Sequence, residues 1–360
     1  MRILASAVGQ YDNVGDTVLR RGFLDHLRTL APLRVFVGDK SDGYISGLGL
    51  QAEDEIERDP QAWRSAVASS LLGRGGIYAF DTGEIEVERR FALRYLKLAP
   101  LLAVNRLRGG AAVQLGVGVR RPTPWRRPIA GVLRLCDAVS WRDEQSRRMM
   151  GLGSVTPDWA FALGAPAEVI LDDELARPRL AIAVRQGLSH MARDRPTDAW
   201  VHTVSAMAER LDLEPVVVAQ IKRDGPLAED LADRLGCDAL TWLDDDHATQ
   251  EARLREVYRQ SRLVLSDRLH ALVIAATEGA VPLALSTGSS DKVTRTLEGA
   301  GIPRTSVTRD LEDVAAVDRT VNDALTRREP IMRAVVDSRS RLGEVTEALR
   351  TRLIRKGILT

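Results

Sequence analysis

Short apolar segments of the chain alternate with longer segments in which apolar residues recur at helical spacing. Short apolar runs are typical of strands that are buried on both faces, and their alternation with helices predicts parallel sheets. The expected strands are residues 3–8, 34–37, 76–80, 112–116 and 138–140 in the first half, and 180–184, 214–219, 239–242, 263–266 and 282–286 in the second. We therefore expect an α/β fold.

An acidic segment divides this pattern into two parts. Residues 172–178 are rich in carboxylates and end at a proline, and a new strand follows at once. We expect one domain over 1–175, a second over 176–328, and an amphipathic helix over 329–360 that packs back across both. Two such domains are expected to face a cleft, because α/β folds bind ligands at the carboxyl ends of their strands.

The composition narrows the class of protein. The 360 residues carry a formal net charge of +1, and 44% of them are hydrophobic. A near-neutral charge argues against nucleic-acid binding, which requires a basic surface. No segment approaches the roughly 20 apolar residues of a membrane span, and the short N-terminal apolar run predicts a strand rather than a signal peptide. We expect a cytoplasmic protein whose contact with a membrane is peripheral, through a partner or a substrate.

The first candidate site lies where the strand 263–266 passes into a helix. Arg268 and His270 fall in the expected first helical turn, where backbone N–H groups and the helix dipole favour an anion. Arg185 directly follows the strand 180–184, at its carboxyl end. This combination predicts a pocket for a phosphate or a carboxylate, with an imidazole that titrates near neutral pH.

A second loop is expected to join this pocket. The strand 282–286 leads through Ser289 to Lys292 at another helix N-terminus, which offers a hydroxyl and a point charge. Taken alone, His270 would more often be a packing or capping histidine. Together with Arg185, Arg268 and Lys292 on loops at one edge of a sheet, a functional role is favoured.

The first domain offers weaker candidates. Asn13 lies in a glycine-flanked loop after the first strand, where an amide could bind a ligand, and Asp16 can cap the helix that follows. Arg142 and Asp143 follow the strand 138–140. Arg142 could face the cleft or form a solvated ion pair with Asp143, and the sequence does not distinguish these two interpretations.

The order of these motifs resembles the polysaccharide pyruvyl transferase family over nearly the whole chain. The matching segments are 13–16, 75–76, 116–118, 139–146, 158–161, 182–185, 266–270, 279–282 and 291–292. The resemblance implies a GT-B-like architecture of two Rossmann-like domains, the first facing the acceptor and the second holding phosphoenolpyruvate. It also implies transfer of the pyruvyl group onto two hydroxyls of a sugar in a cell-surface glycan or glycolipid precursor, giving a cyclic ketal and free phosphate.

The resemblance also assigns roles to the residues. Arg185, Arg268 and Leu269 match positions that hold the donor, with Lys292 and Ser289 beside them, and His270 lies near the reacting carbon. Asn13, Arg142 and Asp143 become acceptor-side candidates, and Asp16 or Asp143 could orient or deprotonate an acceptor hydroxyl. The scheme requires no metal and no cofactor, with phosphoenolpyruvate as co-substrate and a sugar or lipid-linked glycan as the acceptor.

Two other functions remain open from the sequence. A nucleotide-sugar glycosyltransferase of the same fold would share the anion site but would need a glutamate for the ribose, and Glu278 is the nearby candidate. A non-catalytic glycan-binding member of a biosynthetic complex is the other, and the presence of both Arg268 and His270 argues against it.

Overall fold

The computed structural model of the protein divides into two compact units. It describes all residues except 1, 74, 122, 187–194, 287–291 and 360. Unit 1 comprises Met1–Tyr11, Asp16–Ala162 and Arg339–Thr360, and unit 2 comprises Asp12–Gly15 and Leu163–Ser338. Each unit contains its own parallel sheet, as the alternating pattern predicts.

The sheet of unit 1 has eight strands among the described residues, in the order β3-β2-β1-β4-β6-β7-β8, with β5 paired to β6. The strands are β1 (Ile3–Ser6), β2 (Leu33–Phe36), β3 (Glu55–Glu57), β4 (Ile77–Ala79), β5 (Gly83–Ile85), β6 (Ala111–Val119), β7 (Ala138–Trp141) and β8 (Ser154–Val155). The helices of this part are α1 (Val14–Arg28), α2 (Asp42–Ser46), α3 (Pro60–Leu72), α4 (Arg89–Leu107), α5 (Arg126–Leu133), α6 (Glu144–Met150) and the 3₁₀ helix η1 (Trp159–Ala162). The strand β6 is buried along its whole length, as expected for a central parallel strand.

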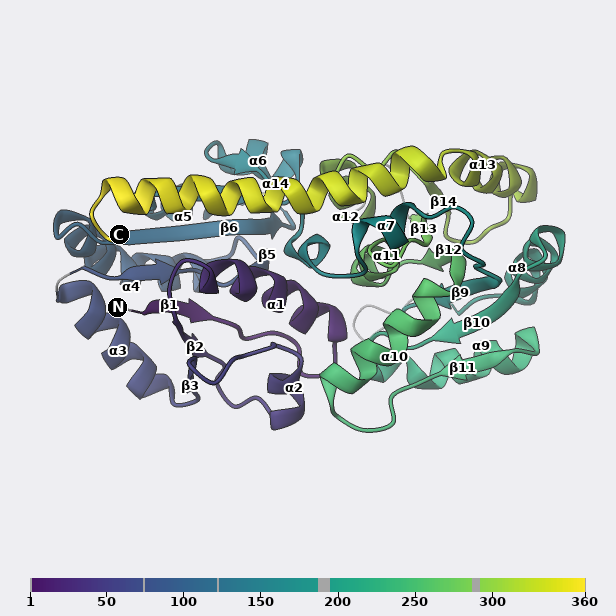
Figure 1. Ribbon diagram of the computed structural model, residues 1–360, viewed down its shortest axis with the longest axis horizontal. Coiled ribbons are helices and arrows are strands. Elements are labelled where there is room, and N and C mark those ends of the chain that lie inside the picture. The colour runs from purple at the N-terminus through teal and green to yellow at the C-terminus, as the bar shows by residue number, and fades with distance from the viewer. Residues whose placement is uncertain (1, 74, 122, 187–194, 287–291, 360) are drawn as a thin grey trace. The chain divides into compact units, whose positions relative to one another are not determined.

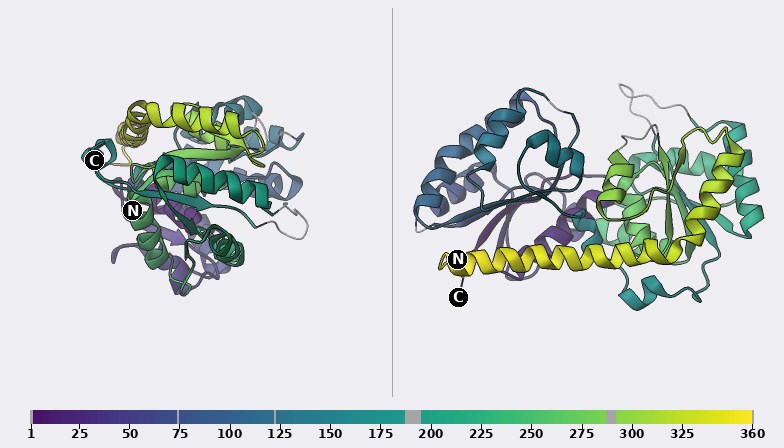
Figure 2. Two further views of the ribbon diagram at one scale, coloured as in Figure 1. Left: turned by 90° about the vertical axis from the view of Figure 1, so that its right-hand side faces the viewer. Right: turned by 90° about the horizontal axis from the view of Figure 1, so that it is seen from above.

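The sheet of unit 2 has six strands over the same described part of the chain, in the order β11-β10-β9-β12-β13-β14. The strands are β9 (Arg179–Ala183), β10 (Glu214–Val218), β11 (Asp238–Leu240), β12 (Ser261–Ser266), β13 (Val281–Ser286) and β14 (Ser306–Thr308). The helices are α7 (Ala167–Leu171), α8 (Asp198–Leu211), η2 (Lys222–Asp224), α9 (Gly225–Leu235), α10 (His247–Arg259), α11 (Leu269–Ala276), α12 (Lys292–Gly299) and α13 (Val314–Thr326). Figure 2 shows helices on either side of this sheet, which explains why its central strands β9, β12 and β13 are mostly buried.

Each sheet has one point at which the strand order reverses direction. In unit 1 the order runs outward from β1 through β2 to β3, and in the other direction from β4 through β6. In unit 2 the reversal lies between β9 and β12. In open α/β sheets the crevice outside the carboxyl ends of the strands at such a point is the usual ligand site. The residues that follow β1, β4, β9 and β12 lie at these two reversal points.

The C-terminal helix α14 (Arg328–Arg355) follows α13 as one long helix (Figure 1). Its first part belongs to unit 2, where Ser338 donates a 2.9 Å hydrogen bond to the carbonyl of Ala300. Its last part belongs to unit 1, where Thr346 is hydrogen-bonded to His26 at 2.7 Å. Lys356, the first residue after the helix, pairs with Asp137. The helix thus supplies core contacts to each unit.

The units also differ from the expected domains. Residues 163–175, expected in the first domain, cluster with unit 2, because Ala165 donates to the carbonyl of Thr277 and Arg328 to the carbonyl of Ile170. The short segment Asp12–Gly15 also clusters with unit 2, although β1 precedes it. This second difference builds part of the candidate site.

Candidate functional site

The corner between β12 and α11 lies at the reversal point of unit 2. Every residue of α11 is buried, so the apolar run 271–276 packs as a helix into the core. Ser266 fixes the turn: its hydroxyl donates to the carbonyl of Ala183 on β9 at 2.6 Å and accepts from the backbone N–H of Arg268 at 2.8 Å. Arg268 is the N-cap residue, one position before the expected first turn, and Leu269 begins the helix with a buried side chain.

The side chain of Arg268 is held by a carboxylate that the sequence did not indicate. Its Nη2 donates a 2.6 Å hydrogen bond to Oδ1 of Asp224, which also accepts from the backbone N–H of Gln186 at 3.0 Å. Asp224 is buried at the end of η2, and burial raises the pKa of its carboxyl while the Arg268 guanidinium opposes that shift. Among the described residues, no group hydrogen-bonds to Nε of Arg268. The bond from Nη2 to Asp224 is therefore the contact that orients this guanidinium.

Arg185 is held in a similar way on the neighbouring strand end. Oδ1 of Asp267 accepts the backbone N–H of Arg185 at 2.9 Å, and the carbonyl of Asp267 accepts Nη2 of Arg185 at 3.2 Å. The other oxygen of Asp267 lies 3.6 Å from Nε of Arg309, which follows β14. Unit 2 therefore gathers Arg185, Arg268 and Arg309 around the reversal point, and two buried carboxylates fix their positions. The sequence analysis had not identified Arg309.

His270 contacts the segment that follows the first strand of the chain. A methyl group at Gly15 would lie 2.6 Å from Nδ1 of His270 and 2.6 Å from Nε2 of Gln220, so only glycine allows this approach. Gln220 donates to Oδ1 of Asn13 at 2.6 Å, and the same oxygen accepts the N–H of Gly15 at 3.0 Å. Unit 2 thus brings Asn13 and His270 together through two residues, Gly15 and Gln220.

Further contacts fix this segment in unit 2. Asn13 forms an antiparallel bridge with Ile221. The carbonyl of Asp12 accepts the N–H of Lys222 at 2.8 Å, and its carboxylate accepts Nη2 of Arg223 at 2.7 Å. The loop 12–15 is therefore a structural part of the His270 site.

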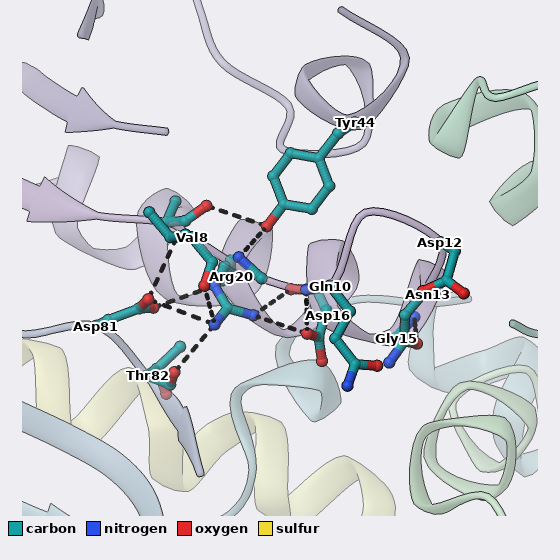
Figure 3. A network of polar contacts seen from close by, with 12 residues as sticks. Val8, Gln10, Asp12, Asn13, Gly15, Asp16, Arg20, Tyr44, Asp81 and Thr82 are labelled. Carbon is teal, nitrogen blue, oxygen red and sulfur yellow. Dashed lines mark hydrogen bonds and ion pairs between the residues drawn. The ribbon is translucent and has the colours of Figure 1, made fainter. Parts of the chain in front are cut away.

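Three further candidates are Lys292, Ser289 and Asp16. Lys292 is the first residue of α12, and Ser289 lies outside the described residues. Asp16 belongs to unit 1, where its carboxylate accepts the N–H of Gln10 at 2.7 Å and lies 3.6 Å from Arg20 (Figure 3).

Arg142 and Asp143 are both buried in unit 1. The Arg142 guanidinium lies 3.5 Å from Glu84 and 3.7 Å from Asp158. Asp143 is the N-cap of α6 and accepts both the N–H and the hydroxyl of Ser146 at 2.8 Å. These contacts stabilise the interior of unit 1 and the start of one of its helices.

The described residues contain neither a metal-binding cluster nor a membrane-spanning helix. Within those residues, no group of three or more histidine, cysteine or carboxylate side chains could hold a metal ion. None of the helices described is long and apolar enough to cross a membrane.

The sequence of residues 54–289 matches the family described as polysaccharide pyruvyl transferase. The chain belongs to this family. The matched segment contains Arg185, Arg268 and His270, whereas Asn13, Asp16 and Lys292 lie outside it. Membership of this family indicates a transferase in polysaccharide biosynthesis. None of the curated proteins matches the chain.

Solved structures of sugar-nucleotide enzymes share the fold. UDP-GlcNAc 2-epimerase from Neisseria meningitidis, bound to UDP-GlcNAc, is 12% identical with a TM-score of 0.58, covering 99% of this chain and 100% of its own. Staphylococcus aureus MnaA, solved with UDP, is 12% identical with a TM-score of 0.56, covering 100% and 98%. Anabaena HepE, in complex with UDP-glucose, is 11% identical with a TM-score of 0.54, covering 99% of each chain. At this identity the similarity supports the fold alone, and it confirms the GT-B-like class of two Rossmann-like domains.

Proposed function

We propose that the protein transfers the pyruvyl group of phosphoenolpyruvate onto two hydroxyls of a sugar in a cell-surface glycan or glycolipid precursor, with release of phosphate. The family membership supports pyruvyl transfer, and the arrangement at the reversal point of unit 2 supports the donor. One observation carries the proposal. Arg268 and His270 both lie at the start of α11, and the guanidinium of Arg185 is held at the end of the neighbouring strand.

The donor requires several cations. Phosphoenolpyruvate carries a phosphate and a carboxylate, and guanidinium groups bind both anions through paired N–H donors. Arg268 and Arg185 take this role in the proposal, with the N-terminus of α11 at Leu269 and with Lys292 at the start of α12. Because Asp224 and Asp267 fix the two arginines beforehand, little side-chain entropy is lost when the donor binds.

The reaction requires a proton at the methylene carbon of the donor. Protonation makes the central carbon electrophilic, so that one sugar hydroxyl can add to it, and a second hydroxyl then displaces phosphate. We assign the proton donor to His270, since an imidazole changes charge near neutral pH and general acid catalysis contributes about 10²–10⁴-fold. The proposal keeps the cytoplasmic location expected from the sequence, and a lipid-linked acceptor would provide the contact with a membrane.

The contacts of Glu278 disfavour a nucleotide-sugar donor. Its side chain is 1% exposed, and its carboxylate accepts Nη1 of Arg255 at 2.7 Å and Nη2 of Arg259 at 3.0 Å. A ribose that used Glu278 would have to displace both guanidinium groups. The candidate that would have supported this alternative is therefore occupied by an internal ion-pair network.

Phosphate release tests the proposal directly. The protein is incubated with phosphoenolpyruvate and a panel of 4-nitrophenyl glycosides and lipid-linked sugars, and acceptor-dependent phosphate is measured. We expect His270→Ala to lower kcat by about 10²-fold or more, and Arg268→Ala to weaken phosphoenolpyruvate binding in calorimetry. His202→Ala is the matched control, because this histidine is exposed on α8. Full turnover by folded His270→Ala, or unchanged donor affinity of Arg268→Ala, would contradict the assignments.

A further inference from the structure

Three helices of unit 1 carry cations and no carboxylate. The helices α3, α4 and α5 pack against each other in that order, and their buried side chains share one core (Figure 1). No Asp or Glu occurs in any of the three, and all their residues are described. Their eight basic residues are Arg64, Arg89, Arg90, Arg94, Lys97, Arg106, Arg126 and Arg127. Since the whole chain has 51 basic and 50 acidic residues, this layer is a strongly positive part of a nearly neutral protein.

The starts of α4 and α5 concentrate this charge. The first two residues of each helix are arginines: Arg89, Arg90, Arg126 and Arg127. The hydroxyl of Thr123, shortly before α5, donates to the carbonyl of Val87, shortly before α4, so the two helix starts lie close together. The positive end of the helix dipole makes arginine unfavourable in a first turn. These arginines therefore do not stabilise their helices, whereas an anionic surface outside the protein would compensate their charge.

Only part of this charge is neutralised within unit 1. Arg90 pairs with Glu86 at 2.6 Å and lies 3.6 Å from Glu88, and both of these glutamates precede α4. In the part of the chain that the structure describes, four exposed cations of the two helices have no carboxylate within ion-pair distance: Arg89, Arg94, Lys97 and Arg127. These four cations are available to an anionic partner.

Apolar side chains lie among these cations. Leu93 and Leu96 are each 42% exposed and follow Arg89 along one side of α4, at the spacing of successive helical turns. Trp125, the N-cap residue of α5, is 38% exposed. We call the four cations, together with Leu93, Leu96 and Trp125, the basic face. Leucine and tryptophan among arginine and lysine are typical of helices that lie in the interface of a membrane.

We propose that the basic face binds the surface of a membrane that contains anionic phospholipids. The cations bind the phosphates of the headgroups, and the two leucines and the tryptophan enter the boundary between headgroups and acyl chains. Arginine and lysine suit this position because their apolar stems lie along the acyl boundary while their charged ends reach the headgroups. The basic face lies wholly within unit 1, and the inference does not depend on the proposed function.

The exposed leucines distinguish a membrane from a nucleic acid as the anionic partner. A nucleic acid is bound through its phosphates and through bases that stack on aromatic side chains, so leucines contribute little. A membrane gains from the cations and from the leucines together. High salt screens the cations and leaves the apolar contribution, so the effect of the leucines should persist there.

Sedimentation with vesicles tests the inference. The full chain is mixed with vesicles of equal parts phosphatidylglycerol and phosphatidylcholine, or of phosphatidylcholine alone, without donor or acceptor. We expect the protein to bind the anionic vesicles, to bind them less tightly as the salt concentration rises, and to leave the neutral vesicles largely unbound. Tryptophan emission should shift to shorter wavelength on binding, and this shift should be lost in Trp125→Phe.

Removal of three cations tests the charge of the basic face. Arg89→Gln, Arg94→Gln and Lys97→Gln, combined in one variant, should weaken binding to the anionic vesicles about 10²-fold, since each cation near such a surface contributes about fivefold. A matched control removes the same number of exposed arginines from α13 and α14 and should bind as the wild type does: Arg319→Gln, Arg352→Gln and Arg355→Gln.

The double variant Leu93→Ser and Leu96→Ser tests the apolar part. It should bind the anionic vesicles more weakly than the wild type at low and at high salt, with an unchanged circular dichroism spectrum. If the wild type does not sediment with the anionic vesicles, or if the variant without the three cations binds them as tightly, the inference is overturned. It is also overturned if the leucine variant binds vesicles like the wild type while the same three cations are required to bind double-stranded DNA. Each of these outcomes is independent of the phosphate-release test of the proposed function.

Discussion

Nη2 of Arg268 donates a 2.6 Å hydrogen bond to Oδ1 of Asp224, and the two residues are 44 positions apart in the chain. The same oxygen accepts the N–H of Gln186, the third residue after the end of β9 at Ala183. One buried carboxylate therefore fixes the guanidinium of the proposed donor site and the start of the neighbouring loop together. This makes Asp224 a positioning residue for the donor.

Asp224→Asn should weaken phosphoenolpyruvate binding about tenfold. The substitution keeps an acceptor for Gln186 but replaces the charge-assisted bond to Arg268, and such bonds contribute about 1.5–3 kcal/mol. Part of that energy holds the guanidinium in its binding orientation. Isothermal titration calorimetry with phosphoenolpyruvate measures the change. Asp318→Asn is the control, because Asp318 forms an exposed ion pair with Arg210. Tighter binding by Asp224→Asn would mean that Asp224 competes with the donor's anionic groups and does not orient Arg268.

Gly15→Ala should impair turnover with little loss of fold. The new methyl group would lie 2.6 Å from Nδ1 of His270 and from Nε2 of Gln220, so the loop or the imidazole must shift. A displacement of about 1 Å of a catalytic group can cost about 10²-fold in rate. Steady-state kcat measures this loss, and circular dichroism checks the fold. In Gly131→Ala, where no atom lies within 4 Å of the new methyl group, kcat should not change. Wild-type kcat in Gly15→Ala would show that the contact with His270 has no part in turnover.

The sequence predicted the sheets because parallel strands leave a continuous apolar run. It missed β5 (Gly83–Ile85), the short strand that precedes α4. In this segment Ile85 and Val87 are buried while Glu84 and Glu86 are partly exposed. Alternation of buried apolar and exposed polar residues indicates a strand, so this alternation in the sequence was the signal for β5.

The sequence predicted only those site residues that directly follow a recognisable strand. Arg268 and His270 follow a recognisable strand, so their place at its carboxyl end could be inferred. Gln220 and Asp224 could not be inferred, because their roles depend on contacts with residues far away in the chain, at Asn13 and Arg268. Local patterns contain no information on such tertiary pairs.

Arg142→Ala should lower the free energy of unfolding by about 3 kcal/mol. The guanidinium is 2% exposed and lies beside two carboxylates, those of Glu84 and Asp158, and removal of one partner of a buried ion pair costs about 3–5 kcal/mol. Chemical denaturation measures the loss. Arg148→Ala, at a side chain that is 75% exposed, should change stability by less than about 1 kcal/mol. If Arg142→Ala keeps its stability and loses acceptor affinity, the residue binds the acceptor and is not a structural residue.

The stability contribution of Asp81 should decrease as the pH rises. Burial raises the pKa of its carboxyl from 3.8 to about 6, so the folded protein binds this proton more tightly than the unfolded chain does. The contribution is fully present below about pH 4 and is lost as the pH rises through about 6. A shift of this size corresponds to about 3 kcal/mol, and solvent screening of the partly exposed side chain lowers the expected change to about 2 kcal/mol.

Urea denaturation of the wild type and Asp81→Asn, at intervals from pH 4 to pH 7.5, measures this contribution as the difference between the two proteins. His26, whose pKa is lowered by burial, titrates in both proteins and cancels in that difference. We expect the stability of the wild type relative to the variant to fall with increasing pH. A rise instead would mean that the ion pair with Arg20 outweighs burial and holds the pKa of Asp81 low.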